Sequence, residues 1–145
     1  MIDHFTLKVS DYAKSKAFYT AALKPLDYAV AMEFGVNCGL GVSGKPDLWL
    51  AQEADSVRPT HFALHTKDRK TVDAFYAAAL AAGARDNGPP GVRTDYHPSY
   101  YAAFVLDPDG HNLEVVCHAP PKAAKRKPAR AKKPKARPAR KRARR

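Results

Sequence analysis

Hydrophobic and polar residues alternate along several short segments of the chain, and two longer segments have helical spacing. Residues 4–9 carry an apolar side chain at every second position, which predicts a strand with one buried face. The alanine-rich residues 12–23 follow, with apolar side chains four positions apart, as on one face of a helix. Ser10 or Asp11 can cap the start of that helix. This part of the chain therefore predicts a strand that leads directly into a capped helix.

The same pattern returns at a fixed offset, which indicates an internal repeat. Residues His4–Leu23 align without a gap on residues His61–Leu80, and ten of the twenty positions are identical. Gly83 is suited to end the second helix in a left-handed conformation. The sequence therefore predicts two copies of one supersecondary unit, residues 1–55 and 57–119.

Each predicted helix is followed by short strand-like runs separated by turns. These runs lie at residues 28–32, 37–42 and 47–52 in the first copy, and near Arg93, at 100–106 and at 112–118 in the second. Asp-Pro-Asp-Gly at 107–110 predicts a tight turn that joins the last two strands as a hairpin. The unit is a βαβββ module that occurs twice, so the predicted fold class is α+β.

The charge is distributed unevenly along the chain. The sequence has 25 Lys and Arg against 14 Asp and Glu, a net charge of +11. Residues 1–121 have a net charge of −3, whereas residues 122–145 hold 14 Lys and Arg and otherwise only Ala and Pro. Such a segment buries no core and repels itself, so residues 120–145 are predicted to be a disordered tail after a domain of residues 1–119. The high isoelectric point belongs to the tail and does not make the domain a basic nucleic-acid-binding fold.

The tail resembles the basic C-terminal tails of linker-histone-like and other DNA-compacting proteins. Its side chains can neutralise phosphates and release counterions, which predicts salt-sensitive, sequence-independent binding to DNA, RNA or another polyanion. It holds no aromatic residue, so stacking on bases is excluded. The alternative is a solvated tail without a role. The tail residues assigned to this binding are Lys125, Arg126, Lys127, Lys132, Lys133, Arg140, Lys141 and Arg142.

Two cysteines, Cys38 and Cys117, do not make a disulfide framework in a chain of 145 residues. The N-terminus has no basic and apolar regions of a signal peptide, and no run approaches the roughly 18 apolar residues of a membrane span. These features predict a cytoplasmic protein without a membrane partner.

The double βαβββ pattern, together with Asp-Pro-Asp-Gly-His-Asn-Leu-Glu at 107–114, resembles the vicinal oxygen chelate superfamily. That superfamily contains glyoxalase I, extradiol dioxygenases, fosfomycin-inactivating thiol transferases and bleomycin-binding proteins. The resemblance covers about residues 2–118. It implies a glyoxalase/dioxygenase-like fold in which two modules form an open, incomplete β-barrel around the site.

Two histidines and one carboxylate are the candidate metal ligands. His4 and His61 occupy the same place in the two repeats, on the strand face opposite to the residues expected to pack under the helices. Glu114 lies in an apolar strand, where a carboxylate is costly unless it is paired or ligating. Two imidazoles and a carboxylate can form a facial triad with open positions for substrate. In the superfamily these three positions match metal ligands. The alternative is that His4 and His61 are hydrogen-bonded residues at strand ends and that Glu114 pairs with a Lys or Arg.

A fourth ligand is missing from the pattern. Aligning residues 47–50 with 112–115 places Trp49 where the twin of Glu114 would be, and glyoxalase I-like enzymes have a carboxylate there. Trp cannot ligate a metal. The resemblance therefore favours three-ligand relatives, namely extradiol dioxygenases and thiol transferases. The fosfomycin enzymes have Trp at that place and Thr at the position of Thr6, but their phosphonate-binding Tyr is Phe104 here, so fosfomycin is not the expected substrate.

Further candidate residues lie in both repeats. His97, in a polar and aromatic loop, is the candidate general acid or base outside the metal ligands. Tyr100 and Tyr101 point to opposite faces of their strand, and the resemblance of Phe104 to the thiol transferase position implies that Tyr100 is the one facing the site. Arg93 can hold an anionic substrate group, and Thr6, Trp49 and Phe104 are the other predicted substrate-binding residues. His111 is expected to be solvated.

The sequence thus predicts a metal-dependent, glyoxalase-like lyase or isomerase acting on a small oxygen-chelating substrate. The expected cofactor is a divalent ion (Fe, Mn, Ni, Co or Zn), with a thiol such as glutathione as a further candidate. The alternatives are a ring-cleaving dioxygenase or thiol transferase with the same ligands, a binding protein of the bleomycin-resistance type without chemistry, and a domain that presents the nucleic-acid-binding tail. A homodimer is expected.

Overall fold

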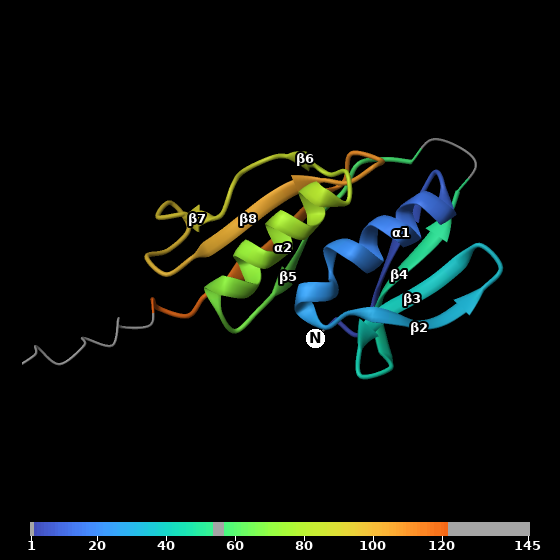
Figure 1. The fold of residues 1–145 in the computed structure, drawn as a ribbon, viewed down its shortest axis with the longest axis horizontal. Helices are drawn as coiled ribbons and strands as arrows, with labels where there is room; N and C mark the ends of the chain where they lie inside the picture. The colour runs from blue at the N-terminus through green and yellow to red at the C-terminus, as the bar shows by residue number, and fades with distance from the viewer. Residues whose placement is uncertain (1, 54–56, 122–145) are drawn as a thin grey trace, which may run out of the picture.

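The computed structural model describes residues 2–53 and 57–121 and contains two α-helices and two β-sheets within them (Figure 1). The first repeat contains β1 (Phe5–Val9), α1 (Tyr12–Ala22), a short 3-10 helix η1 (Lys24–Leu26), β2 (Ala29–Phe34), β3 (Asn37–Val42) and β4 (Lys45–Gln52). The second contains β5 (His61–His65), α2 (Arg69–Ala81), β6 (Arg85–Asp86), β7 (Gly91–Val92), β8 (Tyr101–Leu106) and β9 (Asn112–Cys117).

Local chemistry fixes the ends of both helices. Asp11 caps α1 by accepting the backbone N–H of Lys14 at 3.0 Å, and Asp68 caps α2 by accepting that of Thr71 at 3.1 Å. Gly83 follows α2 with φ +97°, a conformation that glycine adopts without steric cost. The predicted cap and the predicted terminal glycine are thus confirmed.

The two sheets repeat one topology. The first has strand order β1-β4-β3-β2, and the second has β5-β9-β8-β6, with β7 also paired to β8. In both sheets the first strand of the module runs parallel to the last. The strand predicted near Arg93 is instead divided into the two-residue strands β6 and β7. Pro89 and Pro90 lie between them and have no backbone N–H to donate to β8, which accounts for the interruption.

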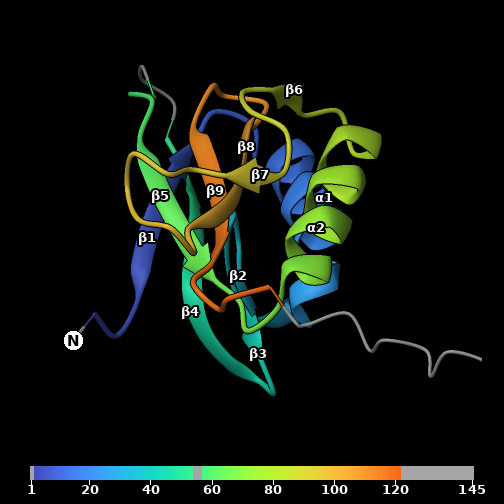
Figure 2. The ribbon, with the colours of Figure 1, turned by 90° about the vertical axis from the view of Figure 1, so that its left-hand side faces the viewer.

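Both helices cover the same side of the two sheets (Figure 2). The core between these layers contains fully buried side chains from both modules, among them Leu7, Tyr19, Leu50, Phe75 and Leu113. The modules meet where β1 and β5 lie beside each other, with the rings of Phe5 and Phe62 5.5 Å apart. The sheet face away from the helices is left open for a site.

The strand register tests the alignment of the two repeats. Thr6 pairs with Trp49 across β1 and β4, and its repeat twin Ala63 pairs with Glu114 across β5 and β9. Trp49 and Glu114 therefore occupy equivalent positions in the two sheets. The third strands agree, because Gly39 pairs with Trp49 and Phe104 pairs with Glu114.

The predicted α+β class with two modules and no closed barrel is confirmed. Cys38 and Cys117 are buried free thiols. Within residues 2–53 and 57–121, no helix has both the length and the apolarity needed to cross a membrane. The tail that was predicted to be disordered lies, from residue 122 on, outside the described residues.

Candidate functional site

Strand parity directs a set of polar side chains to the open face of the second sheet. In β9, Leu113, Val115 and Cys117 are buried in the core under α2, so Glu114 points to the opposite face. Phe104 is its neighbour across β8. His61 opens β5 on the same face as Ala63, the residue paired with Glu114.

Glu114 is a buried carboxylate, 2% exposed, with a partner on each oxygen. The Nε2 atom of His61 donates to Oε2 at 2.9 Å, and the hydroxyl group of Tyr100 donates to Oε1. A buried carboxylate is tolerated when it is hydrogen-bonded in this way. We call these three side chains the Glu114 cluster.

The hydroxyl group of Tyr100 is a permanent donor at neutral pH. Partial burial, together with the hydrogen bond to Glu114, raises the pKa of Tyr100 to about 12. Its ring is held edge-on by Tyr96, His97 and His118, with centroid distances of 4.8, 5.4 and 5.1 Å. These contacts fix the phenol against the carboxylate.

Three histidines form a group in which His97 and His118 contact Tyr100. The Nε2 atom of His97 and the Nδ1 atom of His118 are 2.8 Å apart, so one of the two nitrogens donates to the other. The imidazole of His65 stacks on that of His118 at 5.6 Å. The predicted acid or base His97 is therefore part of an imidazole group next to the Glu114 cluster.

His4 lies at the seam between the modules and not in the Glu114 cluster. Its Nδ1 atom is 2.9 Å from Oδ1 of Asp3, and both side chains are exposed. His4 and His61 nevertheless line one hollow of about 480 Å³, which also includes Phe5, Phe62 and Leu48. This volume is in the range of small-molecule sites. The structure thus joins His61 to Glu114 by a hydrogen bond, and His4 shares with His61 a hollow whose lining does not include Glu114.

Arg93 lies near the Glu114 cluster. Its guanidinium group lies 5.5 Å over the ring of Phe104, and that ring is 6.3 Å from the imidazole of His61. Its Nη2 atom donates to the carbonyl oxygen of Pro89 at 2.6 Å. A cation supported on an aromatic ring can bind an anionic group next to His61.

The first module presents an aromatic surface at the equivalent position. The indole of Trp49 stacks on Phe34 with ring centroids 6.4 Å apart. A Cβ atom on Gly39 would lie 3.0 Å from the indole, so the ring occupies the space left by this glycine. Phe34 is 60% exposed. Thr6 lines a separate hollow of about 530 Å³ that also includes Lys8, Thr60 and His111.

A second group of ligating side chains lies at the turn between β8 and β9. Asp107, Asp109 and His111 are the one set of three among the described residues whose ligand atoms all lie within 4.8 Å of one another. Both nitrogens of His111 are engaged, since Nδ1 accepts the backbone N–H of Thr60 at 3.0 Å and Nε2 donates to the carbonyl oxygen of Lys8 at 2.9 Å.

The two carboxylates of this turn are engaged as well. Asp107 accepts from the hydroxyl group of Tyr19 at 2.7 Å and from two backbone N–H groups of the turn. Asp109 accepts from the backbone and the hydroxyl group of Ser10 in the first module. These bonds reach Ser10, Tyr19 and Lys8 of the first module, and a metal ion here would have to break them, so we interpret the turn as the joint between the modules. The expectation that His111 is solvated is wrong, because it is 1% exposed in this joint.

This joint predicts a pH dependence of folding. Burial raises the pKa of Asp107 above its ordinary value of 3.8 in the folded state, although Tyr19 and His111 act against the shift. A raised folded-state pKa means that the stability from this group is complete below pH 3.8 and is lost as the pH rises through the folded-state value. Urea unfolding of the wild-type and Asp107→Asn proteins between pH 3.5 and 7 checks this, because the stability difference between them should shift against the wild type as the pH rises. A pH-independent difference would contradict it.

Several contacts of the site were not predicted from the sequence. Asp3 as a partner of His4, and Tyr96 and His118 around Tyr100, have no signal in periodicity or repeat spacing. Phe34 was also not predicted, because it lies beyond the predicted strand of residues 28–32 and reaches Trp49 across the intervening strand β3.

Comparisons with known proteins agree with this fold. The sequence model of the Glyoxalase/Bleomycin resistance protein/Dioxygenase superfamily matches residues 1–115. A search of curated proteins finds no match. A solved glyoxalase/bleomycin resistance protein from Albidiferax ferrireducens is 22% identical, with a TM-score of 0.69 over 79% of this chain and 96% of its own.

Two further solved structures are similar. A glyoxalase/bleomycin resistance protein/dioxygenase family enzyme from Burkholderia phytofirmans is 18% identical, with a TM-score of 0.62 over 81% of this chain and 98% of its own. The oxidase ChaP-H2 is 18% identical, with a TM-score of 0.59 over 81% of this chain and 92% of its own. At these identities the likeness concerns the fold alone.

Proposed function

Because the chain belongs to the glyoxalase/bleomycin resistance protein/dioxygenase superfamily, we propose that it is a divalent-metal-dependent enzyme for a small substrate with two neighbouring oxygen atoms. A glyoxalase-like isomerase or lyase reaction is our first candidate. The observation that carries the proposal is the buried carboxylate of Glu114 with the imidazole of His61 at 2.9 Å. Ring cleavage by a dioxygenase and thiol transfer use the same donors and are the alternatives.

The donor atoms fit a divalent ion. Two ligands with bonds of about 2.1 Å at a right angle lie about 3.0 Å apart, and Nε2 of His61 and Oε2 of Glu114 are separated by 2.9 Å. Imidazole and carboxylate donors suit Fe, Mn, Ni, Co and Zn. His4 is proposed as the third ligand through Nε2, since its Nδ1 atom faces Asp3 and histidine ligands commonly direct their other nitrogen to a carboxylate.

The bound ion and the surrounding side chains would have different roles in the proposed reaction. A bound divalent ion would polarise the substrate oxygens as a Lewis acid, and ferrous iron would also support dioxygen chemistry. Tyr100 orients the carboxylate of Glu114, and Arg93 offers its guanidinium group to a substrate anion. His97 is proposed to exchange a proton with the substrate, with His118 as the partner that sets which nitrogen carries the hydrogen.

Trp49 stands where a fourth metal ligand would be, which limits the proposed site to three protein ligands. The register supports its equivalence to Glu114, so the first module offers an indole where a fourth ligand would be. Its stack with Phe34 suits a substrate with an apolar or aromatic part. A three-ligand site of this kind keeps more positions open for substrate than a four-ligand site does.

Replacing Tyr100 with Phe should weaken metal binding without unfolding the protein. The change removes the donor that orients Glu114, and loss of such an outer partner lowers metal affinity by about 10- to 100-fold. Tyr101→Phe is the matched control, because the hydroxyl group of Tyr101 donates to Asp73 on the other face of β8. Calorimetric titration with Zn²⁺ and Mn²⁺ measures the effect. Equal affinities of the two variants would contradict the role of Tyr100.

The function itself is tested by screening protein loaded with each of the five metals. The substrates are α-keto thiohemiacetals, catechols and epoxides with glutathione. We expect turnover of one class, lost in His61→Ala and reduced in His4→Ala. No turnover with any metal, together with tight binding of an apolar ligand, would instead support the second candidate.

The second candidate is a ligand-binding protein of the bleomycin-resistance type. It is favoured by the position of His4 outside the Glu114 cluster and by the exposure of Phe34 (60%) and Met32 (46%). The same side chains, on the edge strand β2, support the expected homodimer, which analytical ultracentrifugation can test.

The third candidate concerns the tail. Its 14 Lys and Arg within 24 residues support a role in binding nucleic acid. Changing the eight assigned tail residues to Gln in the full chain should remove most of the DNA affinity. Unchanged affinity would end this candidate.

A further inference from the structure

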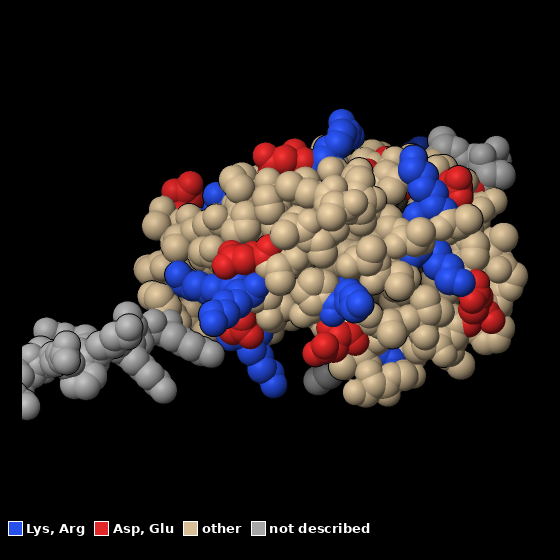
Figure 3. All heavy atoms as spheres, in the orientation of Figure 1, with Lys and Arg blue, Asp and Glu red and all other residues tan. Residues whose placement is uncertain are grey.

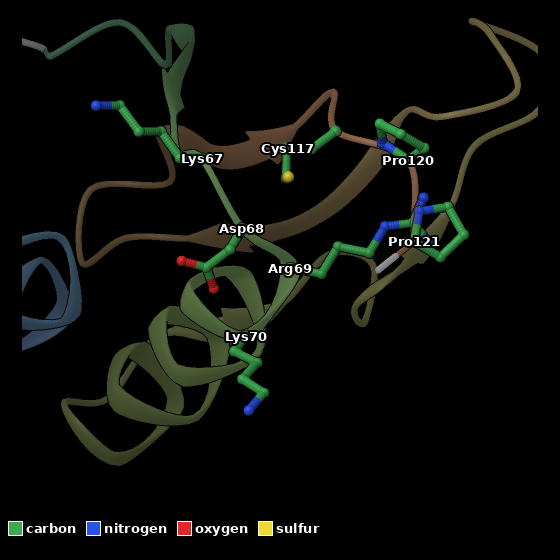
Figure 4. Close-up of a pocket in the computed structure, with 8 residues that line it drawn as sticks. Lys67, Asp68, Arg69, Lys70, Cys117, Pro120 and Pro121 are labelled. Carbon is green, nitrogen blue, oxygen red and sulfur yellow. The ribbon is translucent and has the colours of Figure 1, made fainter. Parts of the chain in front are cut away.

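A third hollow lies where α2 begins and β9 ends. Its volume is about 380 Å³, and its lining includes Lys67, Arg69, Lys70, Pro120 and Pro121 (Figure 4). It is formed by core-side elements, whereas the Glu114 cluster faces the open side of the sheet. The hollow is therefore a feature separate from the proposed metal site.

Arg69 contributes donors that have no partner within the described residues. Its Nε and Nη2 atoms are buried there without a hydrogen bond, and its guanidinium group lies 4.8 Å over the ring of Tyr101. A buried donor left unpaired costs about 1–3 kcal/mol, and more for a charged group. Rotation of the guanidinium group toward the hollow would let an anion accept from these atoms and would remove that cost.

The acidic side chains near Arg69 in the sequence already accept hydrogen bonds from other groups. Asp68 accepts from the backbone and the hydroxyl group of Thr71, and Asp73 accepts from the hydroxyl group of Tyr101. Neither forms an ion pair with Arg69 within 4.0 Å. The positive charge of Arg69 is thus not neutralised by these acids, and the start of the 13-residue helix α2 adds partial positive charge.

The hollow lies at the point where the basic tail leaves the domain. Pro120 and Pro121 form part of its wall, and the next 24 residues contain 14 Lys and Arg and no acid. In Figure 3 blue side chains of the domain lie close to the place where the described chain ends. The charge of the hollow and that of the tail are therefore continuous along the chain, which favours an extended polyanion over a single small anion.

We propose that this hollow binds a backbone phosphate of a nucleic acid held by the tail, with Arg69 as the donor. The side chains of Lys67 and Lys70 extend away from the guanidinium group of Arg69 and contribute only positive charge at the rim (Figure 4). The inference rests on the nucleic-acid role proposed for the tail. It adds a fixed contact from the folded domain, which sets where the domain sits relative to the bound strand. The contact is to phosphate and carries no base specificity.

Binding of the full-chain protein to a 16-base-pair DNA duplex tests the proposal, with fluorescence anisotropy measured at several salt concentrations. We expect Arg69→Gln to weaken binding by about three- to tenfold and to reduce the slope of log affinity against log salt by about 1. Arg85→Gln, an exposed arginine on β6, is the matched control and should change affinity less than about twofold. Equal effects of the two variants would overturn the proposal.

A second variant and a direct NMR signal distinguish loss of the phosphate contact from a folding defect of the Arg69→Gln protein. Lys67→Gln removes a charge from the exposed rim and should weaken binding in the same direction. In NMR spectra the Nε–Hε signal of Arg69 should shift when the duplex is added. A shift with inorganic phosphate but not with the duplex would overturn the assignment, as would an Arg69-dependent affinity for phosphatidylserine vesicles with unchanged DNA affinity.

Failure of the tail proposal is distinguishable from failure of this one. If the tail variant with eight Gln residues binds DNA as the wild type does, the tail role is wrong. If that variant loses most of the affinity but Arg69→Gln matches Arg85→Gln, the tail role stands and the phosphate site in the hollow is wrong.

Discussion

Glu114→Gln is expected to lose the bound divalent ion while the protein keeps its fold. The glutamine can still accept from Tyr100 and occupies the same space, so the sheet has no reason to open. It has no charge, however, and its amide is a poor ligand for the proposed metals. Because loss of an outer partner alone costs about 10- to 100-fold in metal affinity, loss of the ligand itself should cost more than about 100-fold.

Metal content after dialysis, measured by inductively coupled plasma mass spectrometry, checks this expectation. Glu53→Gln is the control, since Glu53 is a half-exposed carboxylate paired with Lys8 at 3.1 Å. We expect about one ion per chain in the control and none in Glu114→Gln. Retention of the ion in Glu114→Gln would show that the carboxylate serves only as a structural partner of His61.

Gly41→Ala is expected to have the largest effect on folding. A Cβ atom at this position would overlap the backbone carbonyl group of Lys45 across the β3–β4 hairpin, at the register shift between Leu40 and Gly41. Backbone atoms of a paired strand cannot turn aside as a side chain can. We expect a loss of about 3 kcal/mol in the free energy of unfolding, at the upper end of overpacking effects.

Gly35→Ala separates this overlap from the general effect of replacing a glycine. Gly35 has φ +54° and no atom within 4 Å of an added Cβ, so only backbone strain of about 1 kcal/mol is expected. Urea unfolding of both variants provides the comparison. A loss in Gly41→Ala no greater than in Gly35→Ala would mean that the hairpin adjusts without cost.

The sequence was sufficient for those features of the fold that depend on periodicity. The apolar run around Glu114 predicted a strand in which this carboxylate needs a partner, and Glu114 does lie in β9 with a partner on each oxygen. The repeat predicted the equivalence of Trp49 and Glu114, which the pairing of their partners Thr6 and Ala63 confirms. The choice of Tyr100 over Tyr101 came from the analogy of Phe104 with the thiol transferases, and the hydroxyl group of Tyr100 does contact Glu114.

Features that depend on contacts between distant segments were beyond such an approach. His111 is buried because its imidazole hydrogen-bonds to the backbone of Lys8 and of Thr60, which are far from it along the chain. No local sequence pattern predicts these contacts. The position of His4 likewise depends on the side chain of Asp3 and on how the modules join at Phe5 and Phe62. Repeat symmetry predicts equivalent strand positions, but it does not predict side-chain rotamers at the seam.

The two copies of the module have diverged in chemistry while keeping their register. Equivalent positions carry Trp49 over Gly39 in the first sheet and Glu114 beside Phe104 in the second. One half of the open face therefore offers an aromatic surface, and the other offers hydrogen-bonding and ligating groups. This division supports a substrate whose polar end lies at His61 and whose apolar end extends toward Trp49.

The location of a bound ion is the most direct test of the proposed metal site. Crystals grown with Mn²⁺ or Zn²⁺ and measured at the absorption edge of the metal would give its position from anomalous differences. We predict one strong peak within about 2.0–2.3 Å of Nε2 of His61 and a carboxylate oxygen of Glu114, with His4 turned to meet it. A peak among Asp107, Asp109 and His111 instead, or no peak in the presence of excess metal, would contradict the account.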